Sequence, residues 1–159
     1  MAALVRLYRL LISVTSSLDS AFLLIVRLYW GVQMAQTGWG KLHSLERVTN
    51  FFTSLGIPAP GVTAVFIATL EFVGGILFAL GLGSRLIALL FVGDMMVAYY
   101  AGDLEALQSF FSSPDKFAAA APFVFLVASL IVLVFGPGKY SLDSMLAKRF
   151  TPTLTSRKP

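Results

Sequence analysis

The chain has 159 residues, of which 57% are hydrophobic and 13% are charged, and its mean hydropathy is +0.83. This composition excludes an ordinary soluble domain and predicts an integral membrane protein, because one crossing of the ~30 Å hydrocarbon core takes about 20 mostly apolar residues. The formal charge of +4 does not indicate nucleic acid as a partner, since most basic residues lie near the two ends, where lipid headgroups attract them.

The sequence contains no cysteine. This excludes thiol-disulfide exchange, thiolate nucleophiles, iron–sulfur ligation and cysteine-type zinc sites. The sequence also has no histidine cluster and no recognisable nucleophile constellation. We therefore expect no catalytic activity of the chain's own and no intrinsic metal, so that any redox activity would rely on a borrowed cofactor.

Residues 1–17 have leucines at helical spacing with Arg6 and Arg9 between them, which predicts an amphipathic helix at the membrane interface. A cleavable signal peptide is the alternative, but the apolar stretch is short, contains arginines and lacks a small-residue cleavage pattern. Ser16, Ser17 and Asp19 then offer N-cap chemistry for a first spanning helix over residues 18–41.

Three further spans are predicted, over residues 61–82, 85–102 and 118–135, because turn-forming glycines and prolines separate these apolar segments. Residues 104–117 contain acids and paired phenylalanines, which favour a short interfacial helix. Residues 18–147 are thus predicted to form an all-α integral membrane four-helix bundle with short interfacial helices. Residues 148–159 are predicted to be a basic cytoplasmic tail.

The distribution of basic residues predicts the orientation of this bundle. Eight lysines and arginines lie on one predicted side and three on the other: Arg6, Arg9, Arg85, Lys139, Lys148, Arg149, Arg157 and Lys158 against Lys41, Arg47 and Lys116. The positive-inside rule places the richer side, which holds both termini, in the cytoplasm.

Arg27, Glu71 and Asp94 lie near the middle of the first three predicted spans. A charge near the bilayer midplane costs at least about 2.5–3.5 kcal/mol and normally faces the bundle interior with a partner. At about 1.5 Å per residue, the three lie roughly 12, 18 and 15 Å from the cytoplasmic boundary. We therefore expect them to form one intramembrane polar cluster in which Arg27 pairs with Glu71, Asp94 or both.

Two interpretations of this cluster stay open. It could serve only to hold three helices in register, which is the best attested use of buried ionic groups. Alternatively, one arginine against two acids leaves a carboxyl group over, and burial would favour its protonated form. Asp94 is the candidate for that proton because Glu71 lies on a stripe of small residues and so in a tighter helix contact. Such a group suits contact with a quinone or another polar headgroup, or proton relay.

Other candidate site residues are aromatic or imidazole side chains. Tyr29, Trp30 and Tyr99 are candidate ligand contacts, although aromatic rings also gather at membrane interfaces for other reasons. His43, the one histidine, is a weak candidate metal ligand. A single interfacial histidine more often forms a local hydrogen bond.

Four segments, in this order and spacing, resemble the DoxX family of membrane proteins over about residues 20–147. They are RLYWGVQMAQTGWGKL (Arg27 to Leu42), FFTSLGIPAP (Phe51 to Pro60), LEFVGGILFALGLGSRLIALL (Leu70 to Leu90) and FGPGKYSLDSML (Phe135 to Leu146). The resemblance implies a four-helix membrane bundle. It also implies an association with membrane redox assemblies, including the quinone-linked subunit of thiosulfate oxidation systems.

These observations predict a multi-pass protein of the bacterial inner membrane, embedded in the lipid bilayer beside other membrane redox subunits. Its predicted function is that of an accessory subunit of a respiratory or photosynthetic electron-transfer complex, contacting quinone or lipid through Arg27, Glu71 and Asp94. The alternative function is a stand-alone proton-coupled carrier of small molecules. Against this alternative, the sequence shows no inverted repeat or pair of broken helices.

Overall fold

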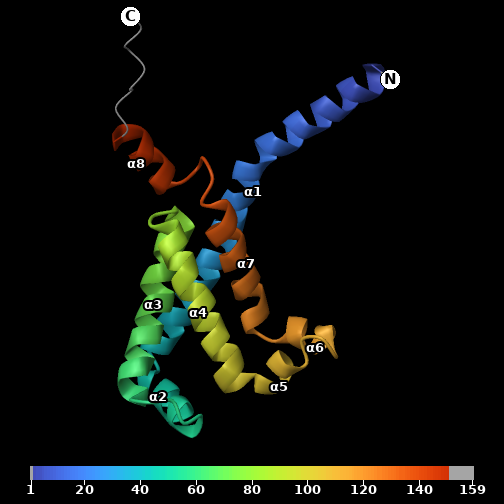
Figure 1. The fold of residues 1–159 in the computed structure, drawn as a ribbon. Coiled ribbons are helices and arrows are strands. Elements are labelled where there is room, and N and C mark those ends of the chain that lie inside the picture. Colours follow the sequence, from blue (N-terminus) through green and yellow to red (C-terminus); the bar gives the residue numbers. More distant parts are fainter. Residues whose placement is uncertain (1, 151–159) are drawn as a thin grey trace, which may run out of the picture.

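The computed structural model describes the backbone of residues 2–150, and the side chains of these residues except 2, 3, 14, 16 and 17. This part of the chain is helical and has no strand (Figure 1), which confirms the predicted all-α class. Its helices are α1 (Ala2–Leu42), α2 (Leu45–Ser54), α3 (Pro60–Leu80), α4 (Ser84–Gly102), α5 (Leu104–Gln108), α6 (Pro114–Ala119), α7 (Pro122–Phe135) and α8 (Leu142–Phe150).

The predicted start of a new helix near residue 18 is wrong, because α1 is one continuous helix of 41 residues. Residues 2–30 contain no glycine or proline to break it, and the Thr15 hydroxyl donates back to the carbonyl oxygen of Leu11 at 2.9 Å instead of capping a new helix. Figure 1 shows the N-terminal part of α1 extending away from the other helices. Residues 4–13 are exposed there.

Three helices, α1, α3 and α4, are long and apolar enough to cross a membrane. Pro60 occupies the first turn of α3, where a missing amide costs little, and Gly81 ends this helix in a left-handed conformation with a φ of 72°. The fourth predicted span is shorter than expected. Its first residues belong to α6, and the helix restarts at Pro122 as α7, which has only 14 residues.

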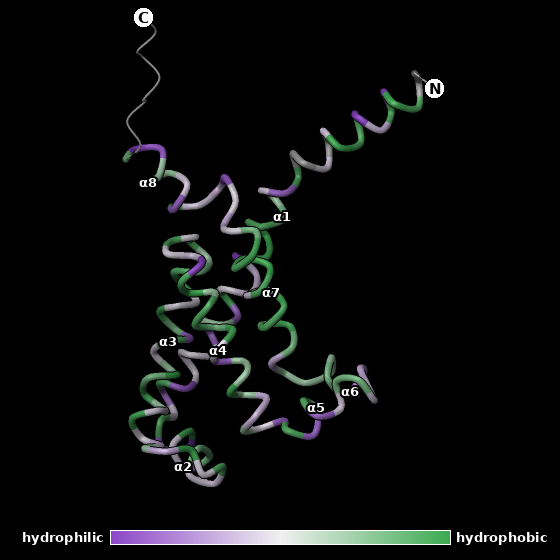
Figure 2. Tube along the Cα trace, viewed as in Figure 1, coloured by the Kyte–Doolittle hydropathy of each residue, from purple (hydrophilic) through white to green (hydrophobic). Residues whose placement is uncertain are grey.

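The hydrophobic core lies where α1, α3, α4 and α7 meet. Phe78 of α3 packs against Phe91 of α4 with ring centroids 5.6 Å apart, and Leu126 and Val132 of α7 complete this core. Hydrophobic residues continue along these four helices, whereas α8 mixes hydrophobic and hydrophilic residues (Figure 2). Many large apolar side chains of α1, α3, α4 and α7 are nevertheless exposed, which is typical of a lipid-facing surface.

The connections divide the molecule into two ends (Figure 1). The turn between α3 and α4 lies near α8 and near the point where the N-terminal part of α1 leaves the bundle. The short helices α2, α5 and α6 lie at the opposite end. The sequence predicted one interfacial helix over residues 104–117, and the structure has two, α5 and α6, separated by turns.

Candidate functional site: a cavity lined by Lys41, Glu71 and Asp94

Glycines determine how α1 lies against α3. A Cβ atom on Gly38 would collide with the backbone of Phe72, one on Gly31 would lie 2.8 Å from the Gly75 carbonyl oxygen, and one on Gly75 would lie 2.5 Å from the Ala35 nitrogen. The two helices therefore touch backbone to backbone, as small residues allow. The stripe of small residues predicted on the second span is confirmed as this contact.

The resulting antiparallel register separates Arg27 from Glu71. Residues 31 and 38 of α1 lie opposite residues 75–79 and 68–72 of α3, so Arg27 reaches the C-terminal end of α3. Its guanidinium donates to the carbonyl oxygen of Ala79 at 3.2 Å and to that of Tyr140 at 2.6 Å. The predicted pairing of Arg27 with Glu71 or Asp94 is therefore wrong. It assumed that the first and second spans begin at the same level.

Arg27 instead belongs to a polar contact at the turn between α3 and α4. The Asp143 carboxylate accepts hydrogen bonds from the backbone nitrogens of Gly83 at 2.8 Å and Ser84 at 2.9 Å, and so caps α4. Partial burial opposes the ionisation of Asp143. The amides of Ser84 and Gly83 and the charge of Arg27 nevertheless bring its pKa below the usual aspartate value.

Lys41, from the last turn of α1, is the partner of Glu71. Its Nζ lies 2.5 Å from Glu71 Oε1, and the lysine side chain is 28% exposed while that of the glutamate is 3% exposed. Lys41 was predicted to end the first span on the outer side of the membrane, and its ion pair with Glu71 was not predicted. The signal was available: aligning Gly31 and Gly38 with Ala79, Gly75 and Ala68 in antiparallel order brings residue 41 toward residue 71.

Asp94 lies beside this ion pair on α4. Its carboxyl group is close enough to that of Glu71 for the two to interact electrostatically, and both residues are more than nine-tenths buried. Glu71 Oε2 and Asp94 Oδ2 have no hydrogen-bond partner among the described residues. The site thus holds one ammonium group, two carboxyl groups and two buried oxygens able to accept further hydrogen bonds.

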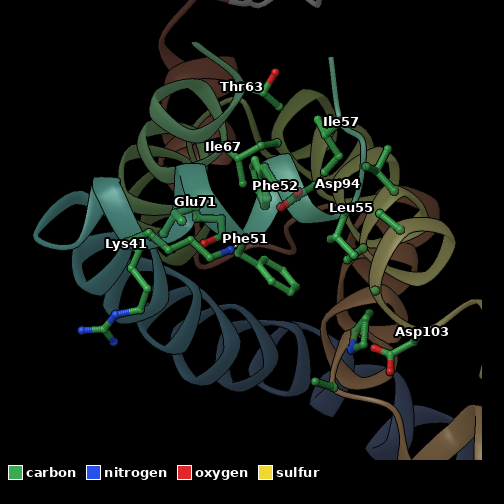
Figure 3. Close-up of a pocket in the computed structure, with 18 residues that line it drawn as sticks. Lys41, Phe51, Phe52, Leu55, Ile57, Thr63, Ile67, Glu71, Asp94 and Asp103 are labelled. Atoms are coloured by element: carbon green, nitrogen blue, oxygen red, sulfur yellow. Dashed lines mark hydrogen bonds and ion pairs between the residues drawn. The ribbon is translucent and has the colours of Figure 1, made fainter. Parts of the chain in front are cut away.

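These three residues lie on the wall of a cavity of about 380 Å³. Figure 3 shows Glu71 and Lys41 on one side of it and Asp94 across from Glu71. Most of the remaining wall is apolar and comes from α2, α3, α4 and the start of α7. The chief apolar lining residues are Val48, Phe51, Phe52, Leu55, Ile57, Ile67, Val97 and Ala98, and Arg47 and Asp103 add charges.

None of the three predicted aromatic contacts lines this cavity. Tyr29 is 56% exposed, and its ring packs against that of Trp30 with centroids 4.8 Å apart. Trp30 also packs on Phe125 of α7. Tyr99 is fully buried; it stacks on Phe117 and donates its hydroxyl to the Phe117 carbonyl oxygen at 2.8 Å. In this structure Trp30 and Tyr99 join helices.

His43 follows Lys41 at the end of α1 and makes a local contact. Its Nδ1 is 2.9 Å from the carbonyl oxygen of Trp39, to which it donates, and its ring lies over the Trp39 ring with centroids 4.1 Å apart. Among residues 2–150, no group of three or more histidine or acidic side chains is arranged to hold a metal ion.

The model of the DoxX family matches residues 22–104, which is more than half of the chain. The chain belongs to the DoxX family. The match extends through α1, α2, α3 and α4, and so includes Arg27, Lys41, Glu71 and Asp94. The matched region ends before α7.

Three curated relatives are similar over most of this DoxX chain. It is 36% identical to "Uncharacterized membrane protein Rv3486" of Mycobacterium tuberculosis over 133 residues, covering 79% of this chain and 82% of the relative. It is 27% identical to "Putative oxidoreductase CatD" of Bacillus subtilis over 125 residues, covering 79% of this chain and 87% of the relative. It is 23% identical to "Inner membrane protein YqjF" of Escherichia coli over 136 residues, covering 84% of this chain and 98% of the relative. No solved structure matches significantly.

Proposed function

We propose that this DoxX protein is an accessory membrane subunit of an electron-transfer complex, and that it holds a quinone-type molecule in the cavity beside Lys41, Glu71 and Asp94. The observation that carries the proposal is the cavity itself. An apolar space of about 380 Å³ ends at three ionisable groups, and two buried oxygens at its wall have no hydrogen-bond partner within the described part of the chain. Ligand sites in proteins combine apolar walls with a few polar groups in this way.

The residues present fit a quinone-type head group. Phe51 and Phe52 of α2 offer aromatic surface to a ring, Lys41 offers N–H donors, and Glu71 and Asp94 offer acceptors. The bound molecule would supply the two-electron chemistry that the protein's own side chains lack. The side chains of this chain would orient it, exclude water and exchange protons through the two carboxyl groups.

The proposal includes four membrane crossings, by α1, α3, α4 and α7. The N-terminal part of α1 and α8 lie at the same end (Figure 1), as an even number of crossings requires. With 14 residues, α7 spans only about 21 Å, which a locally thinned bilayer can accommodate. The distribution of basic residues supports cytoplasmic termini. The membrane would be a bacterial inner membrane, as in the name of the Escherichia coli relative.

The residues outside the helical bundle complete this arrangement. The exposed leucines of residues 4–12 with Arg6 and Arg9 would lie at the cytoplasmic membrane surface. The predicted basic tail, residues 148–159, lies largely outside the described residues. Its Lys148 and Arg149 belong to the last turn of α8.

A binding measurement with cavity-filling variants tests the ligand part of the proposal. Purified protein in nanodiscs would be titrated with a short-chain quinone. Ala98→Leu, which adds volume to the cavity wall, should weaken binding at least about tenfold. Gly93→Leu adds a side chain to the same helix where a Cβ meets open space, and should leave binding unchanged. Equal binding by both variants and the parent would refute a ligand site here.

Native purification tests the assembly part of the proposal. The protein extracted from its own membranes in mild detergent should migrate with redox subunits, and one of the relatives is named "Putative oxidoreductase CatD". Recovery of the protein alone under conditions that preserve known respiratory complexes would argue against an accessory role.

The carrier function is less well supported by the geometry. The residues that line the cavity lie between positions 41 and 71, between 94 and 103, and at 121 and 122, and none comes from the turn between α3 and α4. A carrier needs access from both sides of the membrane in turn. Absence of pH-dependent flux into proteoliposomes is the result we expect.

A further inference from the structure

We propose that the cavity prefers a reduced, hydroxyl-bearing head group to the oxidised form of the same molecule. This inference rests on the proposed function and specifies the chemistry of its ligand. The cavity would select a neutral aromatic diol, which donates two hydrogen bonds, over the matching dione, which only accepts them. The selection would follow from the groups that the protein leaves unpartnered at the cavity wall.

Those groups are acceptors. Glu71 Oε2 and Asp94 Oδ2 are buried and have no hydrogen-bond partner among the described residues, whereas Glu71 Oε1 receives its hydrogen bond from Lys41. The two carboxyl groups also share a side-chain hydrogen bond, so that a proton held by the pair lies between them, and the remaining carboxyl oxygens can only accept. A dione placed against Glu71 and Asp94 would bring carbonyl oxygens against carboxylate oxygens. A diol would donate one O–H to each carboxyl group.

Lys41 does not reverse this preference. Its side chain is 28% exposed and already bonded to Glu71, while the Glu71 side chain is 3% exposed. The buried carboxyl oxygens, and not the Lys41 ammonium group, are therefore the atoms that still need a hydrogen-bond donor. A dione carbonyl could take an N–H from Lys41 but would still leave the two carboxyl oxygens without partners, which is costly for buried groups.

The charges around the cavity also favour a neutral donor over an anion. Lys41 and Arg47 face it from α1 and α2, and Glu71, Asp94 and Asp103 face it from α3 and the C-terminal end of α4. Two positive groups thus stand against three acidic ones. An anionic head group would meet the carboxyl groups unfavourably, and a phenolic hydroxyl carries no charge at neutral pH.

The apolar wall defines the rest of the ligand class. Phe51 and Phe52 of α2, Leu55 just after this helix and Ile67 of α3 lie along the cavity (Figure 3). Val97 of α4 also lines it. Aromatic side chains pack well against a flat ring. The wall thus accepts a substituted ring with a short apolar tail, and its shape does not distinguish the two redox forms. Discrimination would come from the hydrogen bonds alone.

The test is a pairwise comparison of one skeleton in two redox states. The full-length protein in nanodiscs at pH 7 would be titrated, without oxygen, with a short-chain benzoquinol and with its quinone, and the Kd of each measured. We expect the quinol to bind about tenfold tighter or more, the factor that corresponds to one additional hydrogen bond to a charged group. Equal affinity or tighter quinone binding would overturn this inference and leave the proposed site standing. Binding of neither form would overturn the proposed function as well.

A second comparison assigns the preference to Asp94. Asp94→Asn keeps the shape of the side chain and replaces an acceptor oxygen with an amide donor, so the quinol preference should fall severalfold while the quinone binds at least as well. Asp115→Asn, the same change at an exposed residue of α6 outside the cavity, should keep the full preference. An unchanged preference in Asp94→Asn would contradict the assignment.

Discussion

Lys41 and Glu71 form an ion pair in which the Glu71 side chain is almost completely shielded from water and the Lys41 side chain is partly shielded. The shielding decides what the pair contributes. Removing one member of a buried pair leaves an uncompensated charge and typically costs about 3–5 kcal/mol. A pair at the surface contributes little, because water and salt screen it. This chain contains both kinds, in Lys41–Glu71 and Lys116–Glu105.

Lys41→Met should therefore destabilise the protein, by about 3–5 kcal/mol if Glu71 stays ionised and by less if it takes up a proton. Thermal unfolding in detergent would measure the loss. Lys116→Met is the matched control: it removes an exposed lysine that also pairs with a glutamate, and it should leave the unfolding temperature nearly unchanged. Similar behaviour of the two variants would show that Lys41 faces water.

Asp143 provides a prediction about pH. Its pKa is lowered in the folded protein by the amides of Ser84 and Gly83 and by Arg27, against the opposing effect of burial. A lowered pKa means that the carboxylate stabilises the folded state above the ordinary aspartate pKa of about 3.9, and that this contribution is lost as the pH falls through the folded value.

The stability difference between the parent protein and Asp143→Asn should thus be largest near neutral pH and should shrink below about pH 4. Unfolding temperatures from pH 7 to pH 3 would measure it, since other carboxyl groups titrate equally in both proteins. A difference that stays constant over this range would contradict the capping role of Asp143.

At the scale of helices, the contact between α1 and α3 depends on glycines. A Cβ on Gly38 collides with the Phe72 backbone, whereas one on Gly40, two residues further along the same helix, meets nothing within 4 Å. Gly40→Ala should be neutral or slightly stabilising, because alanine favours helices by about 1 kcal/mol over glycine.

Gly38→Ala should have the opposite effect, since backbone atoms cannot move aside as a flexible side chain can. We expect a loss of about 1–3 kcal/mol, the usual cost of overpacking, measured as a lower unfolding temperature than that of Gly40→Ala. Because the same contact places Lys41 beside Glu71, Gly38→Ala should also weaken ligand binding. Unaltered stability would refute the register of α1 and α3.

The helices themselves were largely predictable from sequence, and their relative positions were not. Hydrophobic length and turn residues located the two spans from Pro60 to Leu80 and from Ser84 to Gly102 to within a few residues. Depth counting placed Arg27 level with Glu71 because it assumed a common starting level. The backbone contact at Gly31, Gly38 and Gly75 decides the register instead, and such a contact depends on two segments at once.

Two further differences have local causes. Ser16, Ser17 and Asp19 are good cap residues, but nothing near them breaks the helix, so α1 continues through them. The sequence predicted no helix over the segment of α2, which contains polar residues. Its apolar side chains Val48, Phe51 and Phe52 line the cavity, so this part of the site could not be seen without the helix that carries it.

At the scale of the whole molecule, the proposed topology predicts which residues face the outside of the cell. Because the sequence contains no cysteine, labelling of single introduced cysteines can test this topology. Single cysteines introduced at Asn50 in α2 and at Lys139, which precedes α8, would be the only thiols in the protein. In intact cells a membrane-impermeant maleimide should label Asn50→Cys and not Lys139→Cys. Labelling of both sites in sealed cells, or the reverse pattern, would contradict four crossings with cytoplasmic termini.

If Lys41, Glu71 and Asp94 form the polar wall of a ligand site, an experimental density map of protein purified from its native membrane should show the bound ligand. We expect the Lys41–Glu71 ion pair, with Asp94 beside it and density for a ring-shaped head group between α2 and α4. A map in which side chains fill this space, or in which Glu71 and Asp94 point to different surfaces, would contradict this expectation.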